Sequence, residues 1–438
     1  MPYVPHTDAD RRAMLATIGV QEIEDLFCEI PDNLRLKPGQ LNIPSALDEH
    51  KLALKLTGLA RQNLDATQAD WYLGAGLYDR FIPAIIPQLL SRGEFLTAYT
   101  PYQPEVSQGY LQCIYEFQSM ISELYGMDVA NASMYDGATS LAEACLMATA
   151  HTGRSKVVIS GAVHKNWTEV VQTYCWATGD HVQVIETPNL VTEDFSLVDQ
   201  DAACVVVQYP NFYGSVEDLA KVRDAARAAG ALFVVAADPL AMAILPPPGD
   251  FDADVVVGEG QAMGVAMGFG GPLVGLYACK QEFIRRLPGR IVGRTQDKSG
   301  RPGYVMTLRT REQDIRREKA TSNICTNEAL MALANTIYMT ALGKNGVRSV
   351  AESTVRNTQY AISVLTAAGA KLVNQGPVFG EFVLDLGKDA AEVQAKLIEK
   401  KIMAGLPLGG NRLLVAVTEV RTKDQIDRYA AELKEVLR

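Results

Sequence analysis

Short, continuously apolar segments alternate with helix-like segments between about residues 90 and 320. Strands are predicted at residues 156–160, 181–186, 203–208, 231–237 and 253–257, and helices at 108–125, 137–152 and 218–229. A strand that is covered by helices on both faces of its sheet carries apolar residues at consecutive positions, because neither face meets water. The pattern therefore predicts an α/β fold built on a mostly parallel sheet.

The flanking regions predict two further parts. Residues 1–90 are typical of short amphipathic helices interrupted by Pro and Gly, an arm too thin to bury a core by itself. Residues 91–330 form the predicted large domain, and residues 331–438 a smaller α+β domain. The final helix of this smaller domain begins at a capping box, Thr422–Gln425.

The composition narrows the class of protein. The 438 residues are 48% hydrophobic and 21% charged, as in a globular enzyme. A net charge of −10 argues against nucleic acid or an anionic membrane as the main partner. The seven Cys contain no C-x-x-C pair, which favours reduced thiols in a cytoplasmic protein, and the five His lack metal-ligand spacing. No signal peptide or membrane-spanning run is recognisable.

The ends of two predicted strands carry the most informative side chains. Strand 231–237 leads into Asp238, and strand 253–257 is followed four residues later by Gln261. The arrangement resembles pyridoxal phosphate (PLP) enzymes of the aminotransferase type. There the first strand supplies an Asp to the pyridinium nitrogen and the second a Lys that holds the cofactor covalently. A carboxamide cannot form that bond, so we predict a PLP-enzyme scaffold without its anchor. The alternative for Asp238 is that it only begins a turn.

Two other segments could belong to the same pocket. Gly137 and Thr139 open a helix whose N-terminus suits a phosphate, although an ordinary N-cap explains them equally well and is favoured by the residues alone. His164 follows a strand end and could stack on a pyridine ring or cap a helix. Its neighbour Lys165 precedes Asp238, whereas the cofactor Lys of this fold follows its Asp, so we interpret Lys165 as a solvated charge.

A polar and aromatic loop precedes the helix at 108–125. It contains Tyr99, Tyr102, Gln103 and Glu105, a density of hydroxyl, amide and carboxylate groups that suits a pocket wall. A rigid structural loop is the alternative.

The sequence as a whole resembles the glycine decarboxylase P-protein family, and within it the N-terminal half or separate α subunit. The resemblance covers nearly the whole chain. The most specific string is Ile315–Asn327, and further matches are Thr97–Gly109, Gly258–Gln261, Gly268–Pro272 and Thr310–Gln313.

This resemblance implies the type I PLP-enzyme (aminotransferase-like) fold and a β subunit that carries PLP on a lysine, with Gln261 standing where that lysine falls. It implies an α2β2 assembly that decarboxylates glycine and passes the aminomethyl group to the lipoyl arm of the H-protein. No metal, nucleic acid or membrane is expected.

The resemblance also assigns provisional roles to the candidate residues. Residues expected to line the partner's catalytic site are Tyr99, Tyr102, Gln103 and Glu105, with Gly270 and Gly271 near the partner's cofactor phosphate. A vestigial pocket is expected at His164, Asp238, Gln261, Gly137 and Thr139. Two alternatives remain open, a self-sufficient PLP enzyme that uses another lysine such as Lys280, and a non-catalytic regulatory pseudoenzyme.

Overall fold

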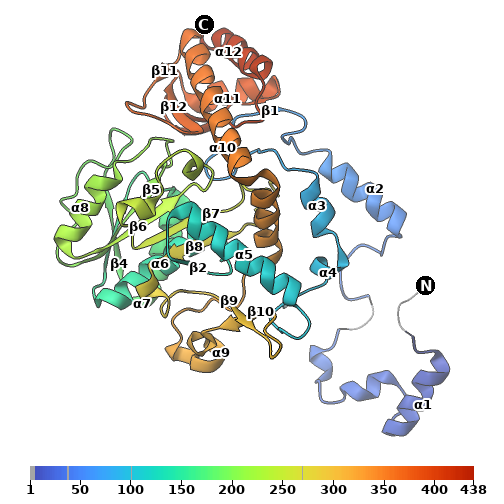
Figure 1. Cartoon of the computed structure of the whole chain (residues 1–438). Helices are drawn as coiled ribbons and strands as arrows, with labels where there is room; N and C mark the ends of the chain where they lie inside the picture. Colours follow the sequence, from blue (N-terminus) through green and yellow to red (C-terminus); the bar gives the residue numbers. More distant parts are fainter. Residues whose placement is uncertain (1–4, 37–38, 100, 269) are drawn as a thin grey trace. The chain divides into compact units, whose positions relative to one another are not determined.

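The computed structural model describes residues 5–36, 39–99, 101–268 and 270–438. Its contacts divide the chain into two units, Met1–Leu64 and Asp65–Arg438 (Figure 1). Thr100 and Phe269, which fall within two of the motifs named above, lie outside the described residues.

The N-terminal unit consists of short helices. α1 (Asp8–Ile18) begins at a capping box between Thr7 and Asp10, and α2 (Glu49–Ala60) follows two 3-10 turns, η1 (Ile23–Phe27) and η2 (Asp32–Leu34). None of the described residues between 5 and 64 is buried. The unit therefore has amphipathic helices but no core of its own.

The larger unit is built on a seven-stranded sheet of order β2-β8-β7-β6-β5-β3-β4. All neighbouring strands pair in parallel except where β8 is involved, which is antiparallel to both β2 and β7. The strands are β2 (Val129–Ala130), β3 (Lys156–Ser160), β4 (His181–Ile185), β5 (Ala202–Tyr209), β6 (Leu232–Ala237), β7 (Val255–Glu259) and β8 (Gly275–Cys279). The mostly parallel α/β sheet predicted from the sequence is confirmed.

Alternate residues of each central strand enter two different cores. In β5, Val205 and Val207 pack on one face of the sheet, and Cys204 and Val206 on the other. The first core includes residues of α5 (Gln108–Tyr125), α8 (Leu219–Ala229) and α10 (Ala329–Ala367), and the second includes residues of α6 (Gly137–Thr152) and α7 (Lys165–Thr178). Because helices cover both faces (Figure 1), these strands read as unbroken apolar runs.

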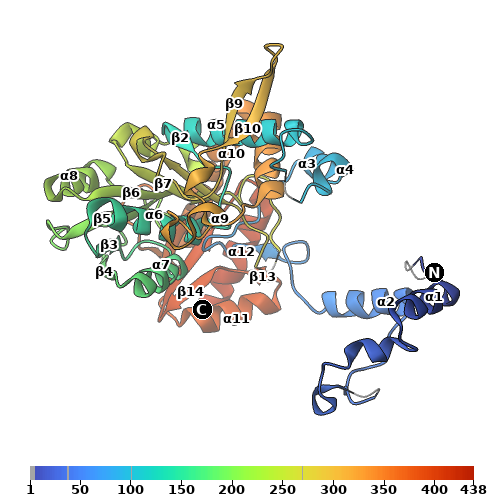
Figure 2. The same cartoon turned by 90° about the horizontal axis from the view of Figure 1, so that it is seen from below.

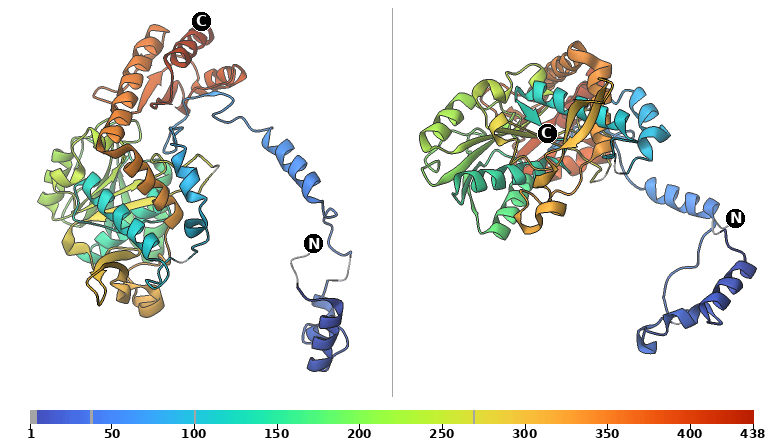
Figure 3. Two further views of the ribbon diagram at one scale, coloured as in Figure 1. Left: turned by 45° about the vertical axis from the view of Figure 1, so that its right-hand side comes forward. Right: turned by 60° about the horizontal axis from the view of Figure 1, so that its bottom comes forward.

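A second sheet lies in the C-terminal part of the larger unit. Its order is β11-β12-β15-β14, all antiparallel. The elements are β11 (Lys371–Leu372), β12 (Glu381–Asp385), α11 (Ala390–Glu399), β14 (Leu406–Gly409), β15 (Arg412–Ala416) and α12 (Lys423–Leu437). The helix α10 runs from the large sheet to this smaller one (Figure 3) and is interrupted at Gly343, whose φ is 60°.

The N-terminal unit ends at Leu64, whereas the sequence pattern predicts an arm that ends near residue 90. The reason is a long-range pairing. β1 (Asp70–Trp71) lies parallel to β13 (Ile402–Met403), and the ring of Tyr72 lies 4.6 Å from that of Tyr429. Residues 65–90 therefore belong to the larger unit.

The remaining elements of the larger unit lie around the large sheet. They are α3 (Ile85–Leu90), α4 (Gly93–Leu96), η3 (Ala241–Ala243), η4 (Pro248–Phe251), η5 (Gln281–Phe283), β9 (Ile291–Gln296), β10 (Pro302–Thr307), η6 (Arg309–Arg311), α9 (Gln313–Arg316) and η7 (Arg317–Lys319). The antiparallel hairpin β9–β10 projects from the body of the unit (Figure 2).

Candidate functional site

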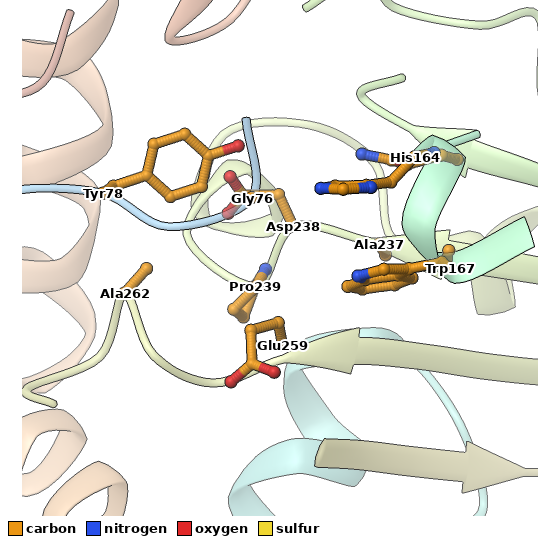
Figure 4. Close-up of a pocket in the computed structure, with 11 residues that line it drawn as sticks. Gly76, Tyr78, His164, Trp167, Ala237, Asp238, Pro239, Glu259 and Ala262 are labelled. Atoms are coloured by element: carbon orange, nitrogen blue, oxygen red, sulfur yellow. The ribbon is translucent and has the colours of Figure 1, made fainter. Parts of the chain in front are cut away.

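A small cavity lies at the carboxyl ends of β6 and β7. Parallel strands end at the same edge of a sheet, and this edge is where open α/β sheets bind ligands. The cavity measures about 40 Å³. It is lined by Gly76, Tyr78, His164, Trp167, Gln208, Ala236, Ala237, Asp238, Pro239, Glu259 and Ala262 (Figure 4).

His164 lies at the N-terminus of α7 and serves both as a cap and as a cavity wall. Its Nδ1 accepts a hydrogen bond from the Asn166 amide (3.1 Å), and its Nε2 lies 2.9 Å from the carbonyl oxygen of Ala75. A carbonyl can only accept, so the proton is on Nε2 and the ring is neutral. Burial lowers the pKa of His164, which favours the same state. Lys165 is exposed, as expected.

Asp238 caps the turn that follows β6. Its Oδ1 accepts from the amides of Leu240 (2.8 Å) and Ala241 (3.2 Å). Asp238 therefore begins a turn, which was the alternative for this residue. It also lines the cavity.

Glu259, at the end of β7, is a cavity residue that the sequence analysis did not identify. Its carboxylate accepts three backbone N–H groups, from Gly137 (2.9 Å), Gln261 (3.0 Å) and Val274 (3.0 Å). Burial nevertheless raises the pKa of Glu259 to about 7. The only sequence signal was its place between two glycines in the Gly258–Gln261 motif.

The N-terminus of α6 is therefore already occupied by side chains. Asp136 accepts from the Thr139 amide (2.7 Å), which is the ordinary N-cap, and Glu259 accepts from the Gly137 amide. A Cβ on Gly137 would lie 2.3 Å from the Trp167 ring, so only glycine fits beneath that ring. Neither Gly137 nor Thr139 lines the cavity.

Gln261 is fully engaged with the backbone. It is 1% exposed. Its Oε1 accepts from the Tyr78 amide (3.0 Å), and its Nε2 donates to the carbonyl oxygens of Tyr78 (3.1 Å) and Val265 (2.8 Å). The amide thus lies behind the cavity wall, where it fixes the segment that carries Tyr78.

Glu381 also holds this segment. It accepts from the Ala75 amide (2.7 Å) and from the Tyr78 hydroxyl (2.8 Å). Burial raises the pKa of Glu381 to about 7. The segment from Ala75 to Tyr78 is therefore held in place beside the cavity at the ends of β6 and β7.

The loop before α5 is not part of this cavity. Tyr99 is 94% exposed, and Gln103 and Glu105 are also exposed. Tyr102 is anchored, because its hydroxyl donates to Asn327 Oδ1 (2.7 Å) and the Arg290 guanidinium lies 4.3 Å from its ring centre.

Gly270 and Gly271 are likewise absent from the cavity lining. They form a turn with φ values of 112° and 144°, and Gly270 is exposed.

Lys280 lies at the opposite end of the sheet. Its Nζ contacts Asp252 (2.5 Å) and Asp254 (2.8 Å), which immediately precede β7. The five residues of β7 place this end about 16 Å from the cavity edge. Lys280 is therefore unable to replace the missing anchor, and none of the described residues that line the cavity is a lysine.

Neither a metal-binding cluster nor a membrane-spanning helix is present among the described residues. No cluster of three or more His, Cys, Asp or Glu side chains suited to a metal ion occurs among them. Within the same residues, no helix combines the length and the apolar character needed to cross a membrane.

Comparison with known proteins gives consistent matches over the whole chain. The sequence profile of the glycine cleavage system P-protein family matches residues 1–433. A "Probable glycine dehydrogenase (decarboxylating) subunit 1" of Anoxybacillus flavithermus is 50% identical over 442 residues, with 98% of each chain covered.

Solved structures agree. An inhibitor-bound glycine decarboxylase (P-protein) of the glycine cleavage system has 44% identity and a TM-score of 0.94 over 100% of both chains. The alanine–glyoxylate aminotransferase of Nostoc sp. matches at 17% identity and a TM-score of 0.59, over 93% of this chain and all of the other. The second match confirms the type I PLP-enzyme fold. The full-length matches confirm the resemblance found in the sequence, and the chain belongs to the glycine cleavage system P-protein family.

Proposed function

We propose that this chain is the α subunit of glycine dehydrogenase (decarboxylating) and that it acts only with a β subunit that carries PLP on a lysine. The observation that carries the proposal is Gln261, which stands at the strand end where this fold supplies its lysine and has its amide committed to the Tyr78 backbone. The relatives named "subunit 1" support an enzyme of more than one subunit. The α2β2 stoichiometry is part of the proposal.

The proposed reaction uses glycine and the lipoylated H-protein. PLP, when bound in the partner, supplies an electron sink that allows glycine to lose its carboxylate as carbon dioxide. The lipoyl disulfide is then opened. One of its sulfurs bonds to the aminomethyl carbon and the other ends as a thiol, so that the lipoyl arm is reduced.

The exposed loop before α5 is the part of this chain proposed to reach the partner's site. Tyr99, Gln103 and Glu105 present a hydroxyl, an amide and a carboxylate to the surface. Tyr102 fixes their position, since its hydroxyl and ring are held by Asn327 and Arg290. In this arrangement the exposed groups orient glycine or the lipoyl thiol, and Tyr102 positions them. The Gly270–Gly271 turn is proposed to lie near the partner's cofactor phosphate, because its backbone N–H groups are accessible without side chains.

Two sets of exposed apolar side chains support a partner protein. In the larger unit, Phe81, Leu96, Tyr99 and Val106 are each more than half exposed. In the N-terminal unit, none of whose described residues is buried, the exposed set comprises Met14, Ile18, Ile23, Leu26, Phe27, Ile30, Leu34, Leu36, Leu41, Ile43, Leu47, Leu52, Leu54, Leu56 and Leu59. Apolar surface of this extent is characteristic of protein interfaces. Both sets are proposed to pack on the β subunit.

A cytoplasmic location remains a proposal. All seven cysteines are free thiols, including the exposed Cys28 and Cys325, which suits a reducing compartment. Cell fractionation tests it.

The test of the function is reconstitution from separate chains. We expect H-protein-dependent release of carbon dioxide from glycine only when both subunits are present, with PLP recovered on a lysine of the β subunit. Full activity of β alone supports the regulatory alternative and contradicts the proposal. Activity of this chain alone also contradicts it. A variant that lacks residues 1–64 keeps the cores of the larger unit and is expected to lose association with β.

A further inference from the structure

The first observation concerns the helix N-terminus at which a phosphate would bind in this fold. A helix N-terminus beside the ends of parallel strands binds anions through its free N–H groups. In this chain the Glu259 carboxylate takes up the Gly137 N–H of α6 together with the N–H groups of Gln261 and Val274. A carboxyl group of the chain itself thus occupies these donors.

The space for a flat ring is the second observation. The Trp167 indole lies over Gly137, and its plane is 15° from that of His164 at a centroid distance of 6.1 Å. The indole lies between His164 and Glu259 above the strand ends (Figure 4). The space for a planar ring is therefore filled by the Trp167 side chain of α7.

The remaining volume is the third observation. The cavity of about 40 Å³ is large enough for ordered water, whereas pockets for cofactor-sized ligands measure roughly 300–1,000 Å³. The Ala75–Tyr78 segment lines it through Gly76 and Tyr78 and is held by Gln261 and Glu381. The residues present therefore do not fit PLP.

From these contacts we propose that the chain permanently occupies its own cofactor site, with the Glu259 carboxylate in the place of a phosphate and the Trp167 indole in the place of a ring. The site binds neither PLP nor inorganic phosphate, covalently or otherwise. Its filled state stabilises the strand ends and the Ala75–Tyr78 segment without any ligand. This inference concerns only the residues of this chain and does not depend on the subunit function.

Electrostatic repulsion and steric overlap both oppose the binding of PLP. A phosphate would have to share three N–H donors with the buried Glu259 carboxyl group. Above the raised pKa of Glu259, about 7, two anions in one buried site would also repel each other. The pyridine ring would overlap the indole, which Gly137 and His164 enclose. Introducing a lysine at position 261 would by itself leave both obstacles in place.

The first test is titration of the unmodified chain with PLP and, separately, with inorganic phosphate. A ligand that binds only the native state must raise the melting temperature. We expect no saturable rise with either ligand and no PLP retained after gel filtration. One PLP or one phosphate bound per chain overturns the proposal.

The second test removes the two filling side chains. Trp167→Ala with Glu259→Ala is expected to bind PLP at least about tenfold more tightly than the unmodified chain, with a saturable rise in melting temperature. The matched control is Trp176→Ala with Glu169→Ala, which removes the same side-chain types from exposed positions on α7 and is expected to gain no binding.

A folded double variant without gained affinity overturns the role of these side chains. If the double variant does not fold, Trp167→Ala with Glu259→Gln keeps a buried amide of similar size and is read in the same way. Failure of that variant too leaves the first titration as the deciding measurement. Each of these outcomes is separate from reconstituted glycine decarboxylation, which tests the subunit function.

Discussion

Replacing Gln261 with leucine tests whether the hydrogen bonds of this side chain stabilise the fold. The leucine side chain has a similar length and no polar atoms. The substitution removes three hydrogen bonds, to the amide and carbonyl of Tyr78 and to the carbonyl of Val265. Because Gln261 is 1% exposed, water has little access to the groups that lose their partner.

The expected loss follows from the count of these bonds. A neutral hydrogen bond contributes a net ~1 kcal/mol to stability, so three contribute about 3 kcal/mol. Unpaired buried carbonyl and amide groups increase the loss, and the additional apolar surface of leucine decreases it. We therefore expect Gln261→Leu to lower the free energy of unfolding of the larger unit by about 3 kcal/mol.

Urea unfolding of the isolated chain, followed by tryptophan fluorescence, measures this quantity. Trp71, Trp167 and Trp176 all lie in the larger unit, so the signal reports on that unit alone. The matched control is Gln172→Leu at an exposed position on α7, where the change is expected to stay within about 0.5 kcal/mol. A loss below about 1 kcal/mol for Gln261→Leu would refute the reasoning, because three buried bonds cannot be that weak together.

Three further predictions concern packing, titration and catalysis. Gly137→Ala places a Cβ 2.3 Å from the Trp167 ring and is expected to cost about 1–3 kcal/mol in unfolding free energy, whereas Gly109→Ala in α5 meets no atom within 4 Å and is expected to be neutral or stabilising. The pKa of Glu381 is raised from 4.5 to about 7, so the folded state keeps a proton that the unfolded state releases. Stability is then expected to fall as pH rises from 4.5 to 7, by at most about 3 kcal/mol, and a Glu381→Gln variant with an unchanged pH slope contradicts this assignment. Tyr99→Phe or Glu105→Gln in the assembled enzyme is expected to lower the decarboxylation rate about a hundredfold with the complex intact; weakened assembly with normal turnover instead identifies a structural loop.

The secondary structure could be predicted because its signals are local. The unbroken apolar run of β5 reflects burial on both faces, and the capping box at Thr422 marks the start of α12 in the structure as in the sequence. The pairing of β1 with β13 could not be predicted, since it joins residues more than 300 positions apart. That pairing is the reason why residues 65–90 leave the arm.

The candidate site was predictable in part for a related reason. Asp238 and His164 meet because both follow parallel strands of one sheet, and a strand end is recognisable from sequence. The role of Glu259 could not be predicted, although this residue lies two positions from Gln261. Its role depends on N–H donors from positions 137, 261 and 274, which only the folded chain brings together.

The sequence by itself determined the fold class, the family and the chemistry that position 261 cannot perform, because these depend on residue types and short motifs. Whether the site left by a missing lysine is open or filled was decided only by the tertiary structure. Its volume results from the meeting of Gly76, Trp167 and Glu259, which come from three distant segments. Packing density at such a point is a property of all the surrounding atoms and has no local signature in the chain.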